Sequence, residues 1–168
     1  MTLYRIASYL LLMMAILLGT IDLMVLLIAL ANPAMLIQVF IIACVVIYSF
    51  TSFSFLIKGI DRQQILRKRT KDLIKVNAYV SMGFAMLFLL QTIAIVSNPQ
   101  LIGEAMKQAT QMQGAEAAQL TPQMLMKLMR YVLYFMCGYS IVLVLHVFYT
   151  LKLLKTHAHL FASEQNEG

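Results

Sequence analysis

Four long runs of apolar residues divide the chain, with polar segments between them. They cover residues 6–31, 34–57, 76–97 and 131–151. Each run is long enough for an α-helix to cross about 30 Å of hydrocarbon, which takes roughly 20 residues. Continuous runs of this kind differ from the short alternating segments of an outer-membrane β-barrel. The pattern predicts an all-α membrane protein with four transmembrane helices in an antiparallel bundle.

Two Asn-Pro pairs mark helix ends, one at Asn32-Pro33 and one at Asn98-Pro99. Proline cannot continue the helical hydrogen-bond ladder, and asparagine favours a turn. Shifting the first pair by 66 residues onto the second also aligns small residues that are four apart, Ala15 with Ser81 and Gly19 with Ala85. Such spacing lets helix backbones approach closely in lipid. The repeat suggests two related helical hairpins, and chance remains the alternative.

Composition and charge place these helices in a membrane and orient them. The chain is 61% hydrophobic and 12% charged, against about 25% charged in a soluble domain. Ten of the thirteen Lys and Arg residues flank one side of the predicted bundle. Basic residues next to a span resist translocation, so both termini are expected in the cytoplasm of a cell with an inner membrane. We predict one transmembrane domain over residues 1–160 and a short disordered polar tail over 161–168.

The two longer connections have different characters. The inner one, residues 58–75, is strongly basic and is expected to turn between Gly59 and Gln64. Its basic side chains are candidates for docking anionic lipid headgroups or a partner protein: Arg62, Arg67, Lys68, Arg69, Lys71 and Lys75. The alternative is that they only fix topology. The outer connection, 98–127, predicts an amphipathic surface helix that stops at Gly114. Thr121-Pro122 then predicts the start of the last helix.

Asp22 is the most informative residue, because it falls near the middle of the first predicted span. The span is too long and too polar for a secretory signal, so we expect an uncleaved helix. A carboxyl group at that depth should face the bundle and find hydrogen-bond donors. The donors expected at its level are Gln91, Tyr139 and Ser140. Two interpretations stay open: a proton- or cation-coupling site, or polar glue that fixes helix register.

A second polar level is predicted about 9 Å inside the cytoplasmic boundary. Ser52, Ser81 and His146 each lie six residues from a boundary lysine. Together with Asp22 they would line a broken polar path for a proton or small solute. The alternative is that each merely hydrogen-bonds a neighbouring helix.

Other chemistries find little support in the sequence. Cys44 and Cys137 are isolated within apolar runs, and only His146 among the histidines lies inside a span, so neither a thiol redox pair nor a bis-histidine haem is expected. No cofactor or metal is predicted, and topology already explains the net charge of +6, so nucleic acid is not an expected partner.

The sequence thus favours a small multi-pass inner-membrane protein that acts through interaction, as an accessory, scaffolding or homo-oligomeric subunit and not as an enzyme. The alternative hypothesis is a small proton- or cation-coupled transporter or channel centred on Asp22.

Overall fold

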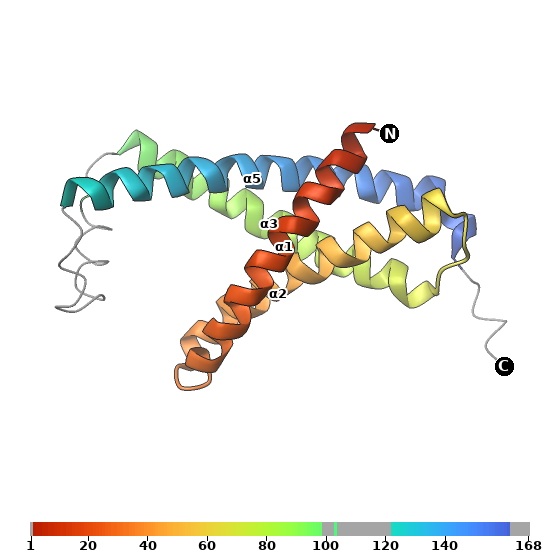
Figure 1. The fold of residues 1–168 in the computed structure, drawn as a ribbon, viewed down its shortest axis with the longest axis horizontal. Coiled ribbons are helices and arrows are strands. Elements are labelled where there is room, and N and C mark those ends of the chain that lie inside the picture. Colours follow the sequence, from red (N-terminus) through yellow and green to blue (C-terminus); the bar gives the residue numbers. More distant parts are fainter. Residues whose placement is uncertain (1, 99–102, 104–121, 162–168) are drawn as a thin grey trace. The chain divides into compact units, whose positions relative to one another are not determined.

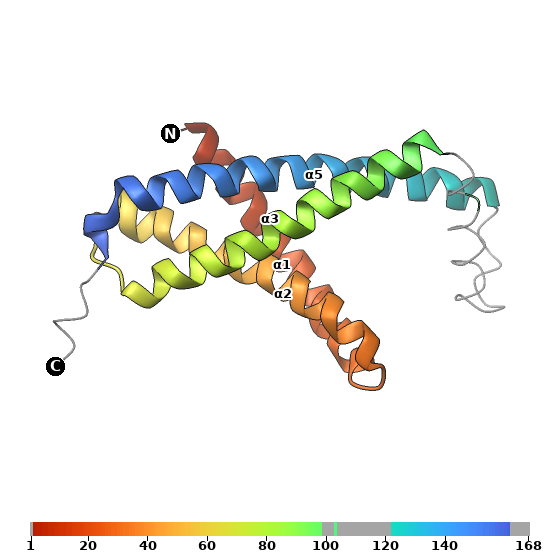
Figure 2. The same ribbon diagram turned by 180° about the vertical axis from the view of Figure 1, so that it is seen from behind.

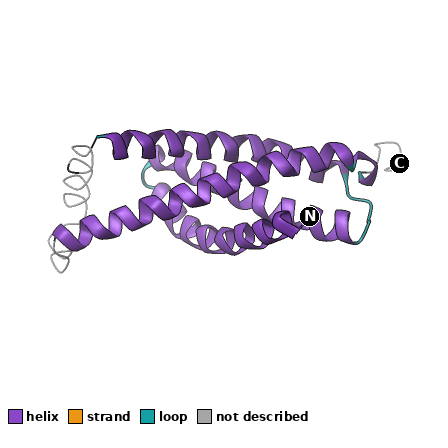
Figure 3. Cartoon of the chain, turned by 90° about the horizontal axis from the view of Figure 1, so that it is seen from above, coloured by secondary structure: helices purple, strands orange, loops and turns teal. Residues whose placement is uncertain are grey.

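The computed structural model describes residues 2–98, 103 and 122–161. Within this part of the chain every regular element is a helix, and there is no strand (Figure 3). Four of the helices are long and apolar enough to cross a membrane. The prediction of four long apolar helices is therefore confirmed. The predicted outer helix apart from Gly103, its stop at Gly114 and the tail at 162–168 lie outside the described residues.

The helices are drawn in Figure 1. Their bounds are α1 (Thr2–Ala29), α2 (Pro33–Ser54), α3 (Lys68–Ser97) and α5 (Pro122–Thr156), with a π-helical segment η1 (Phe55–Asp61) and a short 3₁₀ helix η3 (Ala158–Leu160). Three of the long helices, α1, α3 and α5, contain more residues than the predicted runs, whereas α2 is shorter and is followed directly by the π-helical segment. Polar residues extend α3 and α5 because a helix continues until a capping or breaking residue stops it. As the sequence predicts, α3 ends before Asn98 and α5 begins at Pro122.

The described chain divides into two compact units. The first unit combines Met1–Phe84 with Val142–Gly168, and thus holds α1, α2, η1, the first half of α3 and the end of α5. The second unit, Ala85–Ile141, holds the rest of α3 and of α5. Both regions of chemical interest described below lie wholly in the first unit.

A tight turn joins α1 to α2 in the first unit, and the two helices run together from it (Figures 1 and 2). The Asn32 N–H donates to the Ala29 carbonyl at 3.1 Å, and the Met35 N–H donates back to the Asn32 carbonyl at 3.0 Å. Pro33 opens α2 at the first helical position, where its missing N–H costs no hydrogen bond. The Asn-Pro pair therefore acts as the sequence predicts.

The connection from α2 to α3 turns within the predicted range of Gly59 to Gln64. The helix continues through Gly59 as η1 to Asp61, where the Arg62 N–H donates to the Ile57 carbonyl, and Gln63 then has a positive φ of 51°. Gly59 allows close packing, since a Cβ there would lie 2.9 Å from the Phe55 ring. After the turn, the Leu66 N–H donates to the Leu160 carbonyl at 2.7 Å, just before the start of α3.

The buried positions of α3 repeat those of α1 when residue numbers are shifted by 70. Ala15 then coincides with Ala85 and Asp22 with Thr92, and all four are buried. Four identical pairs also align, namely Leu3 with Leu73, Tyr9 with Tyr79, Ala15 with Ala85, and Leu17 with Leu87. The Asn-Pro pairs suggested a shift of 66 residues, which differs from 70 by about one helical turn. A shift of 66 therefore compares the same helix faces, but it aligns fewer identical residues. The pairing of Ala15 with Ser81 stays a prediction, since both residues are buried and both shifts keep the same face.

Candidate functional site

Two buried polar regions lie on one face of α1. Its buried residues are Tyr4, Ser8, Leu11, Ala15, Asp22 and Ala29. Ala15, one of the two small residues that the sequence analysis places four apart on this helix, is among them, whereas Gly19 is half-buried. Ser8 belongs to the first region and Asp22 to the second. Fourteen residues of helix separate them, which is about 21 Å along the axis.

The first region, here the His146 cluster, joins three helices through five side chains: Tyr4 and Ser8 of α1, Tyr48 of α2, and His146 and Thr150 of α5. All five are at most 5% exposed. Tyr4 stacks on the imidazole, with ring centroids 4.7 Å apart and planes 2° from parallel. The Tyr48 ring meets the same imidazole edge-on at 5.8 Å.

Both imidazole nitrogens of His146 have a hydroxyl partner. Ser8 Oγ donates to the Tyr4 carbonyl at 2.8 Å and also lies 2.8 Å from His146 Nε2. The tautomer of the ring decides which group donates in the Ser8–His146 contact.

The other imidazole nitrogen lies beside two hydroxyl groups. Tyr48 Oη lies 2.8 Å from His146 Nδ1 and donates to Thr150 Oγ1 at 3.0 Å. Thr150 itself donates to the His146 carbonyl at 2.8 Å and lies 3.0 Å from Tyr4 Oη. Every polar side-chain atom of the cluster thus has a hydrogen-bond partner.

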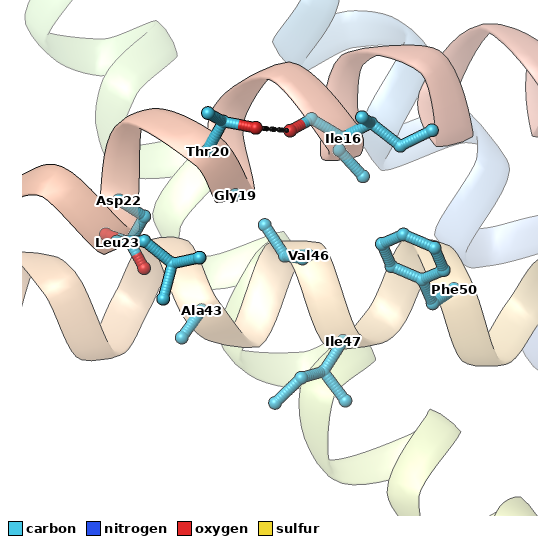
Figure 4. Close-up of a pocket in the computed structure, with 10 residues that line it drawn as sticks. Ile16, Gly19, Thr20, Asp22, Leu23, Ala43, Val46, Ile47 and Phe50 are labelled. Carbon is cyan, nitrogen blue, oxygen red and sulfur yellow. Dashed lines mark hydrogen bonds between the residues drawn. The ribbon is translucent and has the colours of Figure 1, made fainter.

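The second region, here the Asp22 pocket, lies between α1 and α2 (Figure 4). Its volume is about 410 Å³. The α1 side is lined by Ala15, Ile16, Gly19, Thr20, Asp22 and Leu23, and the α2 side by Ala43, Val46, Ile47 and Phe50. The Asp22 carboxyl group lies at one end, between the two helices, and Phe50 lies at the other. Apolar side chains make most of the wall.

Asp22 is 7% exposed, and its Oδ1 atom has no hydrogen-bond partner among the described residues. The other polar side chain of the pocket, Thr20, donates its hydroxyl hydrogen to the Ile16 carbonyl at 2.9 Å (Figure 4). The pocket therefore offers acceptor oxygens within an apolar wall. An isolated group of this kind is costly to bury and calls for a proton or a positively charged ligand.

The donors predicted for Asp22 lie in the second unit, whereas Asp22 lies in the first. Gln91 is exposed, and Tyr139 and Ser140 are buried. Tyr139 Oη, like Asp22 Oδ1, lacks a hydrogen-bond partner in the described part of the chain. A hydrogen bond from these donors to Asp22 stays a prediction.

The three residues predicted to form a second polar level, Ser52, Ser81 and His146, are all buried. Ser52 Oγ donates to the Ser49 carbonyl of its own helix at 3.1 Å. Ser81 is fully buried, and its hydroxyl has no partner within the described residues. Sequence reasoning missed Tyr4, Ser8, Tyr48 and Thr150 as partners of His146. A usable signal was the four-residue spacing of Tyr4 with Ser8 and of His146 with Thr150, which puts each pair on one helix face.

The basic connection presents most of its charge outward. Arg62, Arg67, Lys68 and Arg69 are exposed, and Lys71 and Lys75 are half-buried. Lys71 Nζ lies 5.5 Å from the centre of the Phe161 ring. Arg67 precedes α3, whereas Lys71 and Lys75 lie within it. Among the described residues no group of three His, Cys, Asp or Glu side chains gathers as for a metal ion.

Comparisons with protein-family models, with curated proteins and with solved structures found no match for this chain. The function is therefore argued from its own residues.

Proposed function

We propose that the protein is a small multi-pass protein of a bacterial-type inner membrane that binds and moves a proton or another cation at Asp22. In this proposal the four helices form an antiparallel bundle with both termini in the cytoplasm. The observation that carries it is the buried Asp22 carboxyl group, which lines a pocket and leaves Oδ1 without a hydrogen bond.

The free energy needed to bury the Asp22 carboxyl group supports a functional role. A carboxylate at the centre of a spanning helix costs about 2.5 to 3.5 kcal/mol on insertion scales, and such residues mark ion and proton pathways by default. A carboxyl group that only held helices together would offset part of this free energy by hydrogen bonds to a neighbouring helix. Asp22 Oδ1 makes no hydrogen bond within the described residues.

The internal repeat supplies a second argument. Thr92 of α3 occupies the position that corresponds to Asp22, and its hydroxyl donates to the Phe88 carbonyl one turn earlier at 2.9 Å. The hydroxyl group of this threonine thus has a hydrogen-bond partner within its own helix. The repeated helix therefore does not need an acid there, and Asp22 is a departure that packing alone does not explain.

The distribution of basic residues supports the proposed orientation. Arg62, Arg67, Lys68 and Arg69 are exposed around the start of α3. Positive side chains at a helix N-terminus interact unfavourably with the helix dipole, so helix stability does not explain their position. Basic residues that keep this connection on the cytoplasmic side of the membrane would explain it.

The test is ion flux in vesicles reconstituted with the purified protein. We expect an imposed proton or cation gradient to dissipate faster with the wild type than with Asp22→Asn or Asp22→Thr. Asp72→Asn is the matched control, since it removes an exposed carboxylate of α3. Equal flux in wild type and Asp22→Asn would overturn the proposal, as would wild-type flux no faster than that of empty vesicles.

The second candidate function is the accessory, scaffolding or homo-oligomeric role, and the exposed basic connection favours it. Clustered Arg and Lys beside a span attract anionic headgroups by about 1 kcal/mol for each residue near the surface. We expect Arg67→Gln with Arg69→Gln to reduce cross-linking to a membrane partner or to a second copy, without changing flux. Unchanged cross-linking of the double variant would argue against docking through this connection.

A further inference from the structure

We propose that the ligand of the Asp22 pocket is an amphipathic organic cation, with its positive charge at Asp22 and its apolar body toward Phe50. This inference rests on the proposed function and narrows it to one class of substrate. It joins three observations: a single carboxyl group, an otherwise apolar wall, and a volume of about 410 Å³.

Charge sets the first requirement. Asp22 is the acidic residue of the pocket and is 7% exposed, and its buried Oδ1 atom has no hydrogen-bond partner in the described part of the chain. In surroundings of low dielectric constant a carboxylate interacts strongly with one positive charge. Thr20 adds an oxygen but directs its hydrogen to the Ile16 carbonyl, so it competes little for the Asp22 carboxylate. The pocket therefore matches a single positive charge.

Hydration distinguishes an organic cation from a metal ion. Hard metal cations replace their water shell with about six or more oxygen ligands. The pocket provides carboxyl and hydroxyl oxygens from only Asp22 and Thr20 among its ten lining residues. A substituted ammonium or phosphonium ion carries its charge under apolar groups and needs no such shell. Aromatic rings also attract such ions, and Phe50 is the aromatic residue of the pocket.

Shape and access agree with this ligand class. Pockets for small organic molecules range from about 300 to 1,000 Å³ and have mostly apolar walls with few polar groups. Four lining residues are partly exposed, with 42% to 68% of their surface accessible: Ile16, Leu23, Ile47 and Phe50. In a bilayer these side chains meet hydrocarbon. A molecule that partitions into the membrane can thus reach Asp22 from the side.

The experiment measures binding of tetraphenylphosphonium to the full-length protein in detergent micelles by equilibrium dialysis. Neutral triphenylphosphine oxide is measured in parallel, and empty micelles provide the background. We expect the cation to bind saturably and at least tenfold more tightly than the neutral compound. Similar affinities for the two compounds, or partition no greater than into empty micelles, would overturn the proposal without any variant.

Variants then locate the site. We expect Asp22→Asn to weaken tetraphenylphosphonium binding at least tenfold and Asp72→Asn to change it less than twofold. Circular dichroism and elution volume confirm that each variant is folded. Binding by a folded Asp22→Asn protein within twofold of the wild type contradicts the assignment to this pocket.

The result is separable from that of the flux experiment. Asp22-dependent proton flux without tetraphenylphosphonium binding would refute the ligand class and leave the proposed function standing. Asp22-dependent binding without any flux would support the ligand site and refute transport.

Discussion

The His146 cluster and the Asp22 pocket lie on the same face of one helix, yet they treat a buried polar group in opposite ways. Around His146, three helices contribute donors and acceptors until every polar atom has a partner. At Asp22, apolar walls surround a carboxyl oxygen that has no partner in the described chain. A satisfied group holds helices together, whereas an unsatisfied one is available to a ligand. We therefore expect the first region to stabilise the fold and propose that the second binds a ligand.

The largest effect is expected from His146→Leu. Removing the imidazole takes a partner from Ser8 and from Tyr48 and removes the surface on which Tyr4 stacks. We expect a loss of about 2 to 4 kcal/mol in the free energy of unfolding, from one or two unsatisfied buried groups together with lost packing. Unfolding by sodium dodecyl sulfate in mixed micelles measures it. His159→Leu is the control, because His159 is exposed and should change stability by less than about 0.5 kcal/mol. Equal losses of stability in His146→Leu and His159→Leu would contradict the stabilising role of the His146 cluster.

Thr150→Val tests whether hydrogen bonds between helices matter more than those within one helix. Thr150 Oγ1 lies within 3.0 Å of both Tyr4 Oη and Tyr48 Oη, whereas the described bond of Thr92 goes to its own helix. We expect Thr150→Val to cost about 1 to 2 kcal/mol and Thr92→Val about 0.5 kcal/mol or less. The same unfolding assay compares them. A larger loss for Thr92→Val would contradict the role given to the cluster.

Gly19→Ala examines the packing beside the pocket. A Cβ at this position would lie 3.5 Å from Val46 Cγ1, which is ordinary van der Waals contact. We expect a gain of about 0.5 to 1 kcal/mol, because alanine is the better helix former. Thermal unfolding followed by circular dichroism measures the change. A loss of stability would show that α1 and α2 need the closer approach that the small-residue spacing suggests.

Asp22→Asn should change stability least. If Asp22 binds a ligand and does not tie helices together, the substitution removes no hydrogen bond at Oδ1 and should alter the free energy of unfolding by about 0.5 kcal/mol or less. Its effect should instead be seen in flux and in cation binding. A loss of unfolding free energy as large as that of His146→Leu would indicate that Asp22 instead holds helices together by hydrogen bonds.

Local chemistry made several features predictable. Pro33 and Pro122 open helices, and α3 ends before Asn98, because a proline or an asparagine acts within one turn of its own position. The small residue Ala15 likewise predicted part of the buried face of α1. The close packing of Gly59 was not predictable in this way. It involves Leu66, which only the folded connection brings near Gly59.

The sequence by itself determined that the chain is helical, apolar enough to cross a membrane, and marked by one acid in its first helix. Those properties depend on residue type and on spacing of a few residues. The tertiary structure decided the partners. Tyr48 and His146 are 98 residues apart, and Leu66 pairs with Leu160 across a similar distance. Helical periodicity fixes which face a residue occupies, but not which helix meets that face or at what height. For that reason the polar cluster and the unpartnered carboxyl group emerged only when the helices were packed.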